Sequence, residues 1–143
     1  MNHLWLVFGL LSAVTAALVG IFGKIGLQSA DANTATAIRA IIMALFLVVV
    51  VMFQGNLGQI PVIISDKRTF GFIILSGLAG ALSWLFYFLA LKFGKVAQVA
   101  PIDKLSVVLA TILAVVFLGE KISVLNGLGV ALIALGAILV ALG

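Results

Sequence analysis

The stretch AQVAPIDKLSVVLATILAVVFL, residues 97–118, is a long apolar run with proline, aspartate and lysine near its beginning. A helix needs about 20 mostly apolar residues to cross the hydrocarbon core of a bilayer. Further runs of this kind occupy residues 4–23, 34–53, 70–91 and 125–142. Because the runs are continuous rather than alternating, they predict helices and not a membrane barrel. We therefore expect an all-α integral membrane protein with five transmembrane helices.

The composition also indicates a membrane protein. Of the 143 residues, 65% are hydrophobic and 8% are charged, and the mean hydropathy is +1.43. A soluble domain is about half apolar and about a quarter charged, and a small one leaves much of its surface in water. The length predicts a single domain over residues 1–143. The first run is long for a signal-peptide core and has no Lys or Arg before it, so we expect it to remain as a span.

Basic residues in the predicted loops bear on the orientation of the chain. An odd number of spans places the two termini on opposite sides of the membrane. The basic residues are nearly balanced between the sides. Lys67, Arg68 and Lys121 lie with the N-terminus, against Lys24, Lys92 and Lys95, with Arg39 a short way inside the second span, so the count is three against three or four. A fixed orientation usually shows a clear excess on one side. The near-tie is typical of a chain that inserts both ways, and chance in a small count gives the same result.

Several classes of function are disfavoured. The net charge of +4 is small and the basic residues are scattered, so we expect no nucleic-acid partner. The chain has no cysteine, and its one histidine, His3, lies at the N-terminus. It contains no Ser–His–Asp set, no HExxH and no GxxxxGK[ST] motif. We expect no catalytic residue, no metal, no cofactor and no enzyme.

Ionisable residues near one membrane face form a first candidate site. Lys24 closes the first span, Arg39 lies inside the second, and Asp103 and Lys104 open the fourth. Charged groups within a membrane are costly and tend to face a cavity or a partner. Consecutive residues such as Asp103 and Lys104 do not face one another on a helix. One hypothesis is that Asp103 pairs with Arg39 or Lys24 and gates or positions the helices; the alternative is that Asp103 favours the start of its own helix while Lys104 reaches the headgroups.

Pro101 allows two interpretations of the fourth span. In one, it stands in the first turn, where Asp103 is favoured by the helix dipole and Lys104 reaches the headgroups. In the other, the helix begins at Ala97 or earlier, and Pro101 interrupts it and frees carbonyls to line a cavity. The sequence leaves both open. At the other end of the span, we expect Glu120 to be an interfacial carboxylate.

A few polar and aromatic residues stand out within the spans. Trp84 and Tyr87 are three residues apart on the third span and share a helix face. They belong either to the aromatic belt at the headgroups or to the wall of a pocket. Ser12 and Thr15 on the first span more often bond their own helix backbone than a ligand.

The order of these motifs resembles an EamA domain of the drug/metabolite transporter superfamily. The matching features are AP at residues 100–101, LGE at 118–120, a glycine-rich helix over 127–136, FGKIG at 22–26 and ATAIR at 35–39. The likeness extends over nearly the whole chain. Single motifs are weak, whereas their order and spacing over five spans are fairly specific.

The resemblance implies a function and an assembly. Similar members carry two such domains, inverted relative to each other, whereas this chain holds one. It therefore implies an antiparallel, dual-topology homodimer in lipid, in the prokaryotic cytoplasmic membrane. It implies a secondary transporter with alternating access that exports a small organic solute such as a metabolite, an amino acid or a drug-like compound.

The resemblance also bears on the site residues. In the family, the first four helices of each half line the cavity, so the candidates for contact with the substrate are Trp84, Tyr87, Ser12 and Thr15. The pair Asp103 and Lys104 departs from the apolar residues common in two-domain members, so no role for it carries over. Two alternatives remain: a half-transporter that needs a different partner chain, and a non-transporting scaffold or accessory subunit.

Overall fold

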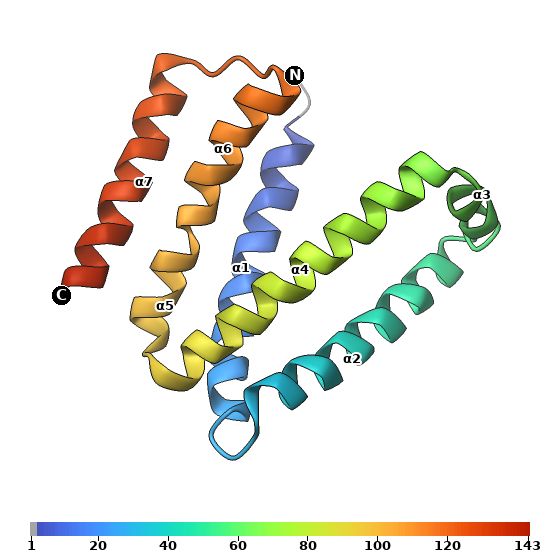
Figure 1. Cartoon of the computed structure of the whole chain (residues 1–143), viewed down its shortest axis with the longest axis horizontal. Helices are drawn as coiled ribbons and strands as arrows, with labels where there is room; N and C mark the ends of the chain where they lie inside the picture. The colour runs from blue at the N-terminus through green and yellow to red at the C-terminus, as the bar shows by residue number, and fades with distance from the viewer. Residues whose placement is uncertain (1–2) are drawn as a thin grey trace. The chain divides into compact units, whose positions relative to one another are not determined.

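The computed structural model describes residues 3–143, which form helices and no strands (Figure 1). In chain order the helices are α1 (Leu4–Gly26), α2 (Ala32–Phe53), α3 (Gln59–Ser65), α4 (Lys67–Phe93), α5 (Val96–Asp103), α6 (Leu105–Leu118) and α7 (Val124–Leu142). Five helical segments are long and apolar enough to cross a membrane, with α5 and α6 together making one, Val96–Leu118. The prediction of an all-α integral membrane protein with five transmembrane helices is confirmed.

The helices run past the predicted spans mainly where basic residues lie. Helix α1 continues to Gly26, and α4 begins at Lys67 and ends at Phe93. Lys24 and Lys92 stand in the last turns of these two helices. A cation near a helix C-terminus is favoured by the helix dipole, and its long side chain can reach out of the apolar region. A prediction from hydropathy alone therefore makes such helices too short.

Side chains set the start of two helices. Asp31 caps α2, because its Oδ1 accepts hydrogen bonds from the Thr34 amide at 2.8 Å and the Thr34 hydroxyl at 2.9 Å. These bonds, the amide first, hold the pKa of Asp31 below its usual value. Ser123 caps α7 in the same way, accepting from the Asn126 amide at 3.1 Å. Both caps satisfy amides that have no partner inside the helix.

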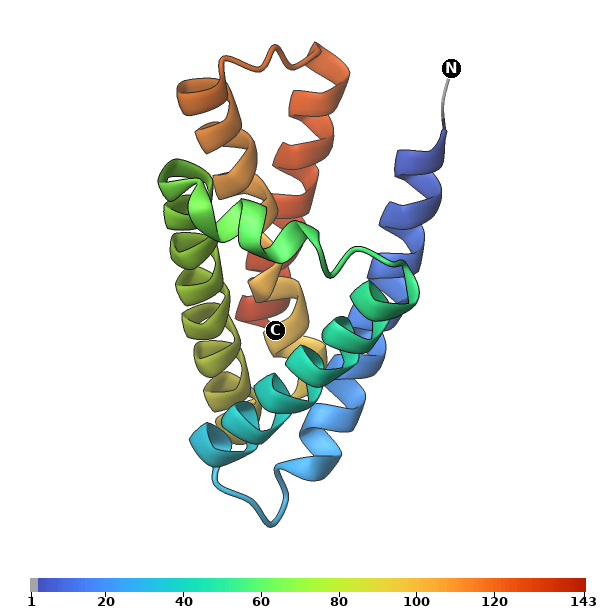
Figure 2. The same cartoon turned by 90° about the vertical axis from the view of Figure 1, so that its right-hand side faces the viewer.

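The chain divides into two compact units. Unit 1 comprises residues 1–22, described from residue 3 onward, and 93–143; unit 2 comprises residues 23–92. In unit 1, α7 packs against both α5 and α6, with Ala137 buried (Figure 1). In unit 2, α2 and α4 are joined through α3, and the start of α2 lies beside the end of α4 (Figure 2).

The fourth span is interrupted at Lys104. Pro101 lies inside α5, where it lacks the amide hydrogen that would bond to the preceding turn. The Lys104 amide donates to the Pro101 carbonyl at 3.1 Å, and the Val107 amide donates to the Lys104 carbonyl at 3.0 Å. These bonds have the tighter three-residue spacing of a 3₁₀ turn. Of the two interpretations of Pro101, the structure shows the one in which the proline is inside the helix.

Candidate functional site

The buried side chains of unit 2 gather where the start of α2 meets the end of α4. Leu27, Ala32, Phe88 and Leu91 are at most 4% exposed. Thr36 is also buried, and its hydroxyl donates to the Ala32 carbonyl at 2.7 Å, so it is satisfied within α2. This small core fixes the end of α4 against the start of α2 and the loop before it.

Two lysines hold helix ends together beside this core. The Lys24 ammonium donates to the Leu91 carbonyl at 2.6 Å. The Lys92 ammonium donates to the carbonyls of Ala30 at 2.6 Å and Leu27 at 3.4 Å. Carbonyls at the C-terminal end of a helix have no intrahelical donor and attract cations. Lys24, a predicted charge-pair residue, therefore makes a contact within unit 2 that ties α1 to α4.

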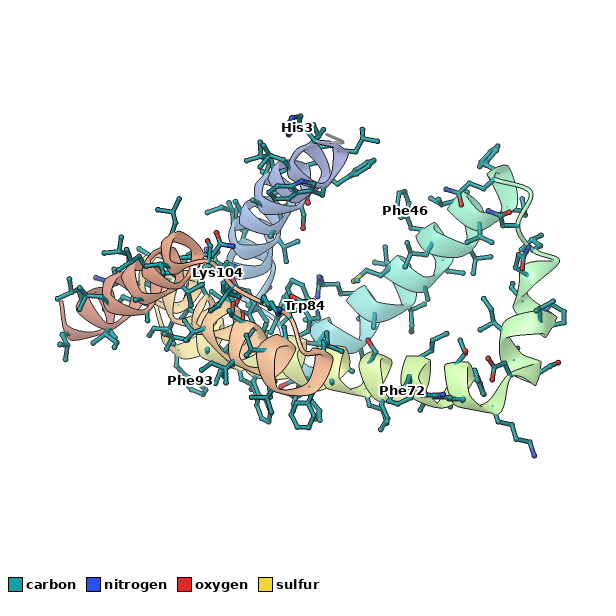
Figure 3. The ribbon with its side chains drawn as sticks, turned by 90° about the horizontal axis from the view of Figure 1, so that it is seen from above. His3, Phe46, Phe72, Trp84, Phe93 and Lys104 are labelled. Atoms are coloured by element: carbon teal, nitrogen blue, oxygen red, sulfur yellow. The ribbon has the colours of Figure 1, made fainter. Side chains whose placement is uncertain are left out.

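Arg39 lies across aromatic side chains of α4. Its guanidinium carbon is 3.6 Å from the centroid of the Trp84 ring and 5.1 Å from that of Phe88. The Trp84 and Tyr87 rings meet edge to face, with centroids 5.6 Å apart and an interplanar angle of 85°. Figure 3 shows Trp84 on the part of α4 that lies near the start of α2. We call Arg39, Trp84, Tyr87 and Phe88 the Arg39 site.

The Arg39 site lies within the spans and not at their ends. Arg39 comes seven residues after Ala32, the first residue of α2, so its Cα is about 10 Å along the helix. Trp84 comes nine residues before Phe93, the last residue of α4, which is about 14 Å. The guanidinium is therefore held on the rings at this depth instead of reaching back to the headgroups.

No carboxylate of unit 2 pairs with Arg39 in the structure. Asp31 caps α2, and Asp66, at the opposite end of α4, accepts from the amide of Arg68 and the hydroxyl of Thr69. The Thr69 hydroxyl and amide hold the pKa of Asp66 below its usual value. Within unit 2, the recorded contacts of the Arg39 guanidinium are aromatic faces.

Asp103 and Lys104 form an ion pair at the break in the fourth span. The Lys104 ammonium is 3.2 Å from Asp103 Oδ2. The expectation that these consecutive residues do not face one another is wrong, because Asp103 ends α5 and Lys104 links it to α6. The interruption lets the two side chains meet. The expected pairing of Asp103 with Arg39 or Lys24 would join the two units and stays a prediction.

The remaining predicted residues lie in unit 1. Ser12 and Thr15 are exposed on α1, and the Thr15 hydroxyl donates to the carbonyls of Leu11 at 2.9 Å and Ser12 at 3.0 Å. Glu120 is exposed in the loop after α6 and lies at the edge of an open groove of about 670 Å³ between α6 and α7. The contacts within unit 2 bring together Trp84, Tyr87 and Arg39, with Lys24 near the end of α4; Ser12 and Thr15 belong to the other unit.

Gly23 gives the core of unit 2 a close helix contact. A Cβ atom at this position would lie 3.1 Å from two ring carbons of Phe88. We expect Gly23→Leu to displace Phe88 and to destabilise the protein by about 1–3 kcal/mol, since overpacking forces side chains out of their preferred positions. The thermal midpoint in detergent measures the effect. Gly26→Leu is the control, since an added Cβ there meets nothing within 4 Å; equal midpoints for the two variants would contradict the prediction.

Comparisons with known proteins agree with the membrane architecture. The EamA-like transporter family matches residues 3–142. A Sinorhizobium protein named as an uncharacterized transporter in the cobO 3′ region is 46% identical over 144 positions, which cover 99% of each chain. An uncharacterized protein of Methanocaldococcus jannaschii is 23% identical over 137 positions, or 96% of each chain. No solved structure matches. The chain belongs to the EamA-like transporter family and is a membrane transporter.

Proposed function

We propose that the protein is a secondary transporter that exports a small organic solute by alternating access, as an antiparallel homodimer in a prokaryotic cytoplasmic membrane. It performs no covalent chemistry on the solute. The observation that carries the proposal is the odd number of spans in a chain that matches one family domain. Two copies inserted in opposite orientations would form an inverted repeat, an arrangement that many transporters use around a site near the bilayer midplane.

The charge distribution supports insertion in both orientations. The loops on the two sides carry three basic residues each, and Arg39 adds at most one more to the side of Lys24, so neither side has a clear excess. Both relatives match this chain over nearly their whole length, so each is also about the size of one domain. A full set of ten helices would then need two chains.

One face of α4 supports association with a second copy. An added Cβ at Gly77 or Gly80 would meet nothing within 4 Å, and the nearby side chains of Leu78 and Leu82 are more than half exposed. Small residues let membrane helices approach closely and pack without a hydrophobic driving force. We place the contact between copies on this face.

We propose that the Arg39 site contributes the solute-binding wall, with Ser12 and Thr15 lining the same cavity in the assembled transporter. Lys24, Asp103 and Lys104 act at the gate. The interruption after Pro101 supports this, since discontinuous helices commonly form the binding sites of transporters. If the Asp103→Asn variant showed normal flux and normal assembly, Asp103 would have no role in the gate.

Flux through purified protein tests the proposal. Liposomes containing only this chain would be preloaded with unlabelled amino acids and related metabolites, and counterflow of the labelled compound would be recorded. We expect accumulation above that of protein-free liposomes for at least one solute. Background flux with every solute would contradict transport by this chain alone; if adding a second small membrane protein restored flux, the half-transporter alternative would take its place.

A further inference from the structure

The Arg39 guanidinium lies over the Trp84 ring, and its recorded contacts in unit 2 are with aromatic rings. A guanidinium is planar and carries five N–H donors at its rim. Stacking at 3.6 Å over the Trp84 ring uses the flat face of the cation. The nitrogen atoms are not sealed off, since no enclosed side-chain nitrogen without a partner occurs among residues 3–143. The donors of Arg39 are therefore available to a ligand.

The surroundings of Arg39 carry a surplus of positive charge. Lys24 and Lys92 contribute two more cations at the same end of unit 2, where the one carboxylate, Asp31, is attracted to Lys92. The nearest carboxylate in sequence, Asp31, is engaged at the helix cap. A cation at membrane depth is stabilised by an anion that comes within reach of its donors.

The neighbouring rings offer an apolar wall beside these donors. Trp84 and Tyr87 are partly exposed, and Phe88 is buried behind them. The rings of Trp84 and Phe88 have centroids 6.0 Å apart, and those of Tyr87 and Phe88 are 6.2 Å apart, so the three form one cluster whose aromatic surface is provided by Trp84 and Tyr87. The site thus places one fixed cation next to two partly exposed aromatic rings.

We infer that Arg39 binds the carboxylate of the transported solute, while Trp84 holds the guanidinium in position and the aromatic surface contacts the organic part of the solute. The inference rests on the proposed transport of a small organic solute and specifies its class as organic carboxylates. Lipid phosphate has the same anionic chemistry, but Arg39 lies about 10 Å from the start of α2, away from the headgroups.

The chain offers a direct reporter for this binding. Its tryptophans are Trp5 and Trp84, and Trp5 is 72% exposed on α1. Trp5→Phe therefore leaves Trp84, in contact with Arg39, as the only source of tryptophan emission. The purified variant in phosphatidylcholine nanodiscs would be titrated with N-acetyl-leucine and with succinate, and with the neutral amide of each. We expect saturable emission changes with the carboxylates and none with the amides.

Substitutions in this background identify the binding group. Arg39→Gln should weaken carboxylate affinity about 10-fold or more, because a charge-assisted hydrogen bond is lost. Arg39→Lys should bind with intermediate affinity, since an ammonium keeps the charge and loses the planar fork. Arg68→Gln, at the other arginine of the chain, should bind like its parent. The carboxylate-dependent rise in thermal midpoint gives a second readout that does not depend on tryptophan emission.

Equal responses to carboxylates and amides would overturn the inference, as would unchanged carboxylate affinity in Arg39→Gln or the absence of a response to any carboxylate. A response to added phosphatidylglycerol in place of solute would assign the site to lipid and also overturn it. Carboxylate binding without counterflow in liposomes would keep the inference and contradict the proposed transport. Counterflow of neutral solutes alone, unaffected by Arg39→Gln, would keep the transport and contradict the inference.

Discussion

Two variants with oppositely biased loop charges should each be inactive alone and active when expressed together. The first variant, Asn56→Lys with Lys95→Gln, changes the balance of basic loop residues from three against three to four against two. The second, Gln28→Lys with Lys121→Gln, changes it to two against four. All four positions are exposed, and neither variant alters the net charge. A charge excess of this size directs the loops that carry it to the cytoplasmic side.

The physical reason is that an antiparallel dimer needs both orientations. Each variant alone would populate one orientation and fall to background flux, whereas co-expression would supply both partners and restore counterflow. The control is a double variant at the positions of the first variant, Asn56→Gln with Lys95→Arg. It leaves both charges unchanged and should transport like the parent. Parental flux from either biased variant expressed alone would contradict the antiparallel assembly.

Trp84→Ala should have the second large effect, because it removes the ring on which Arg39 rests. A cation–π contact away from water contributes about 2 kcal/mol, which corresponds to more than a tenfold change in an equilibrium. We expect counterflow to fall by about 10-fold or more, and Trp84→Phe to retain part of it because a smaller ring remains. The measurement is the initial rate of counterflow at equal protein density in liposomes.

Phe46 supplies the matched control for Trp84. It is an aromatic residue of α2 that is 65% exposed and stands apart from the Arg39 site (Figure 3). Phe46→Ala removes a comparable apolar side chain and should leave counterflow near the parental rate. If Trp84→Ala and Phe46→Ala reduced counterflow equally, the ring beneath Arg39 would have no special part in transport.

The helices of this protein are largely predictable from hydropathy, because each long apolar run has one stable form in a bilayer. The ends of the helices are harder to predict from hydropathy, because Lys24 and Lys92 lie in final helical turns and bind carbonyls of other segments. The position of Pro101 inside α5 was also undecided, because the helix begins after Lys95 without a side-chain cap that marks it.

The site was partly predictable. Trp84 and Tyr87 share a helix face by their spacing, and a charge at Arg39 is conspicuous in an apolar run. The contact between Arg39 and Trp84 depends on how α2 meets α4, and spacing along one helix holds no information about that. Phe88 was missed, although its position four residues after Trp84 places it on the same face.

The most direct test uses the absence of native cysteine to measure the orientation of the chain. Ser29→Cys and Asn56→Cys place single thiols in exposed loops at opposite ends of α2. Intact cells would be labelled with a membrane-impermeant thiol reagent, before and after permeabilisation. The proposed assembly predicts that about half of each variant is labelled in intact cells and all of it after permeabilisation. Complete labelling of one variant in intact cells, with none of the other, would show a single orientation and contradict the antiparallel homodimer.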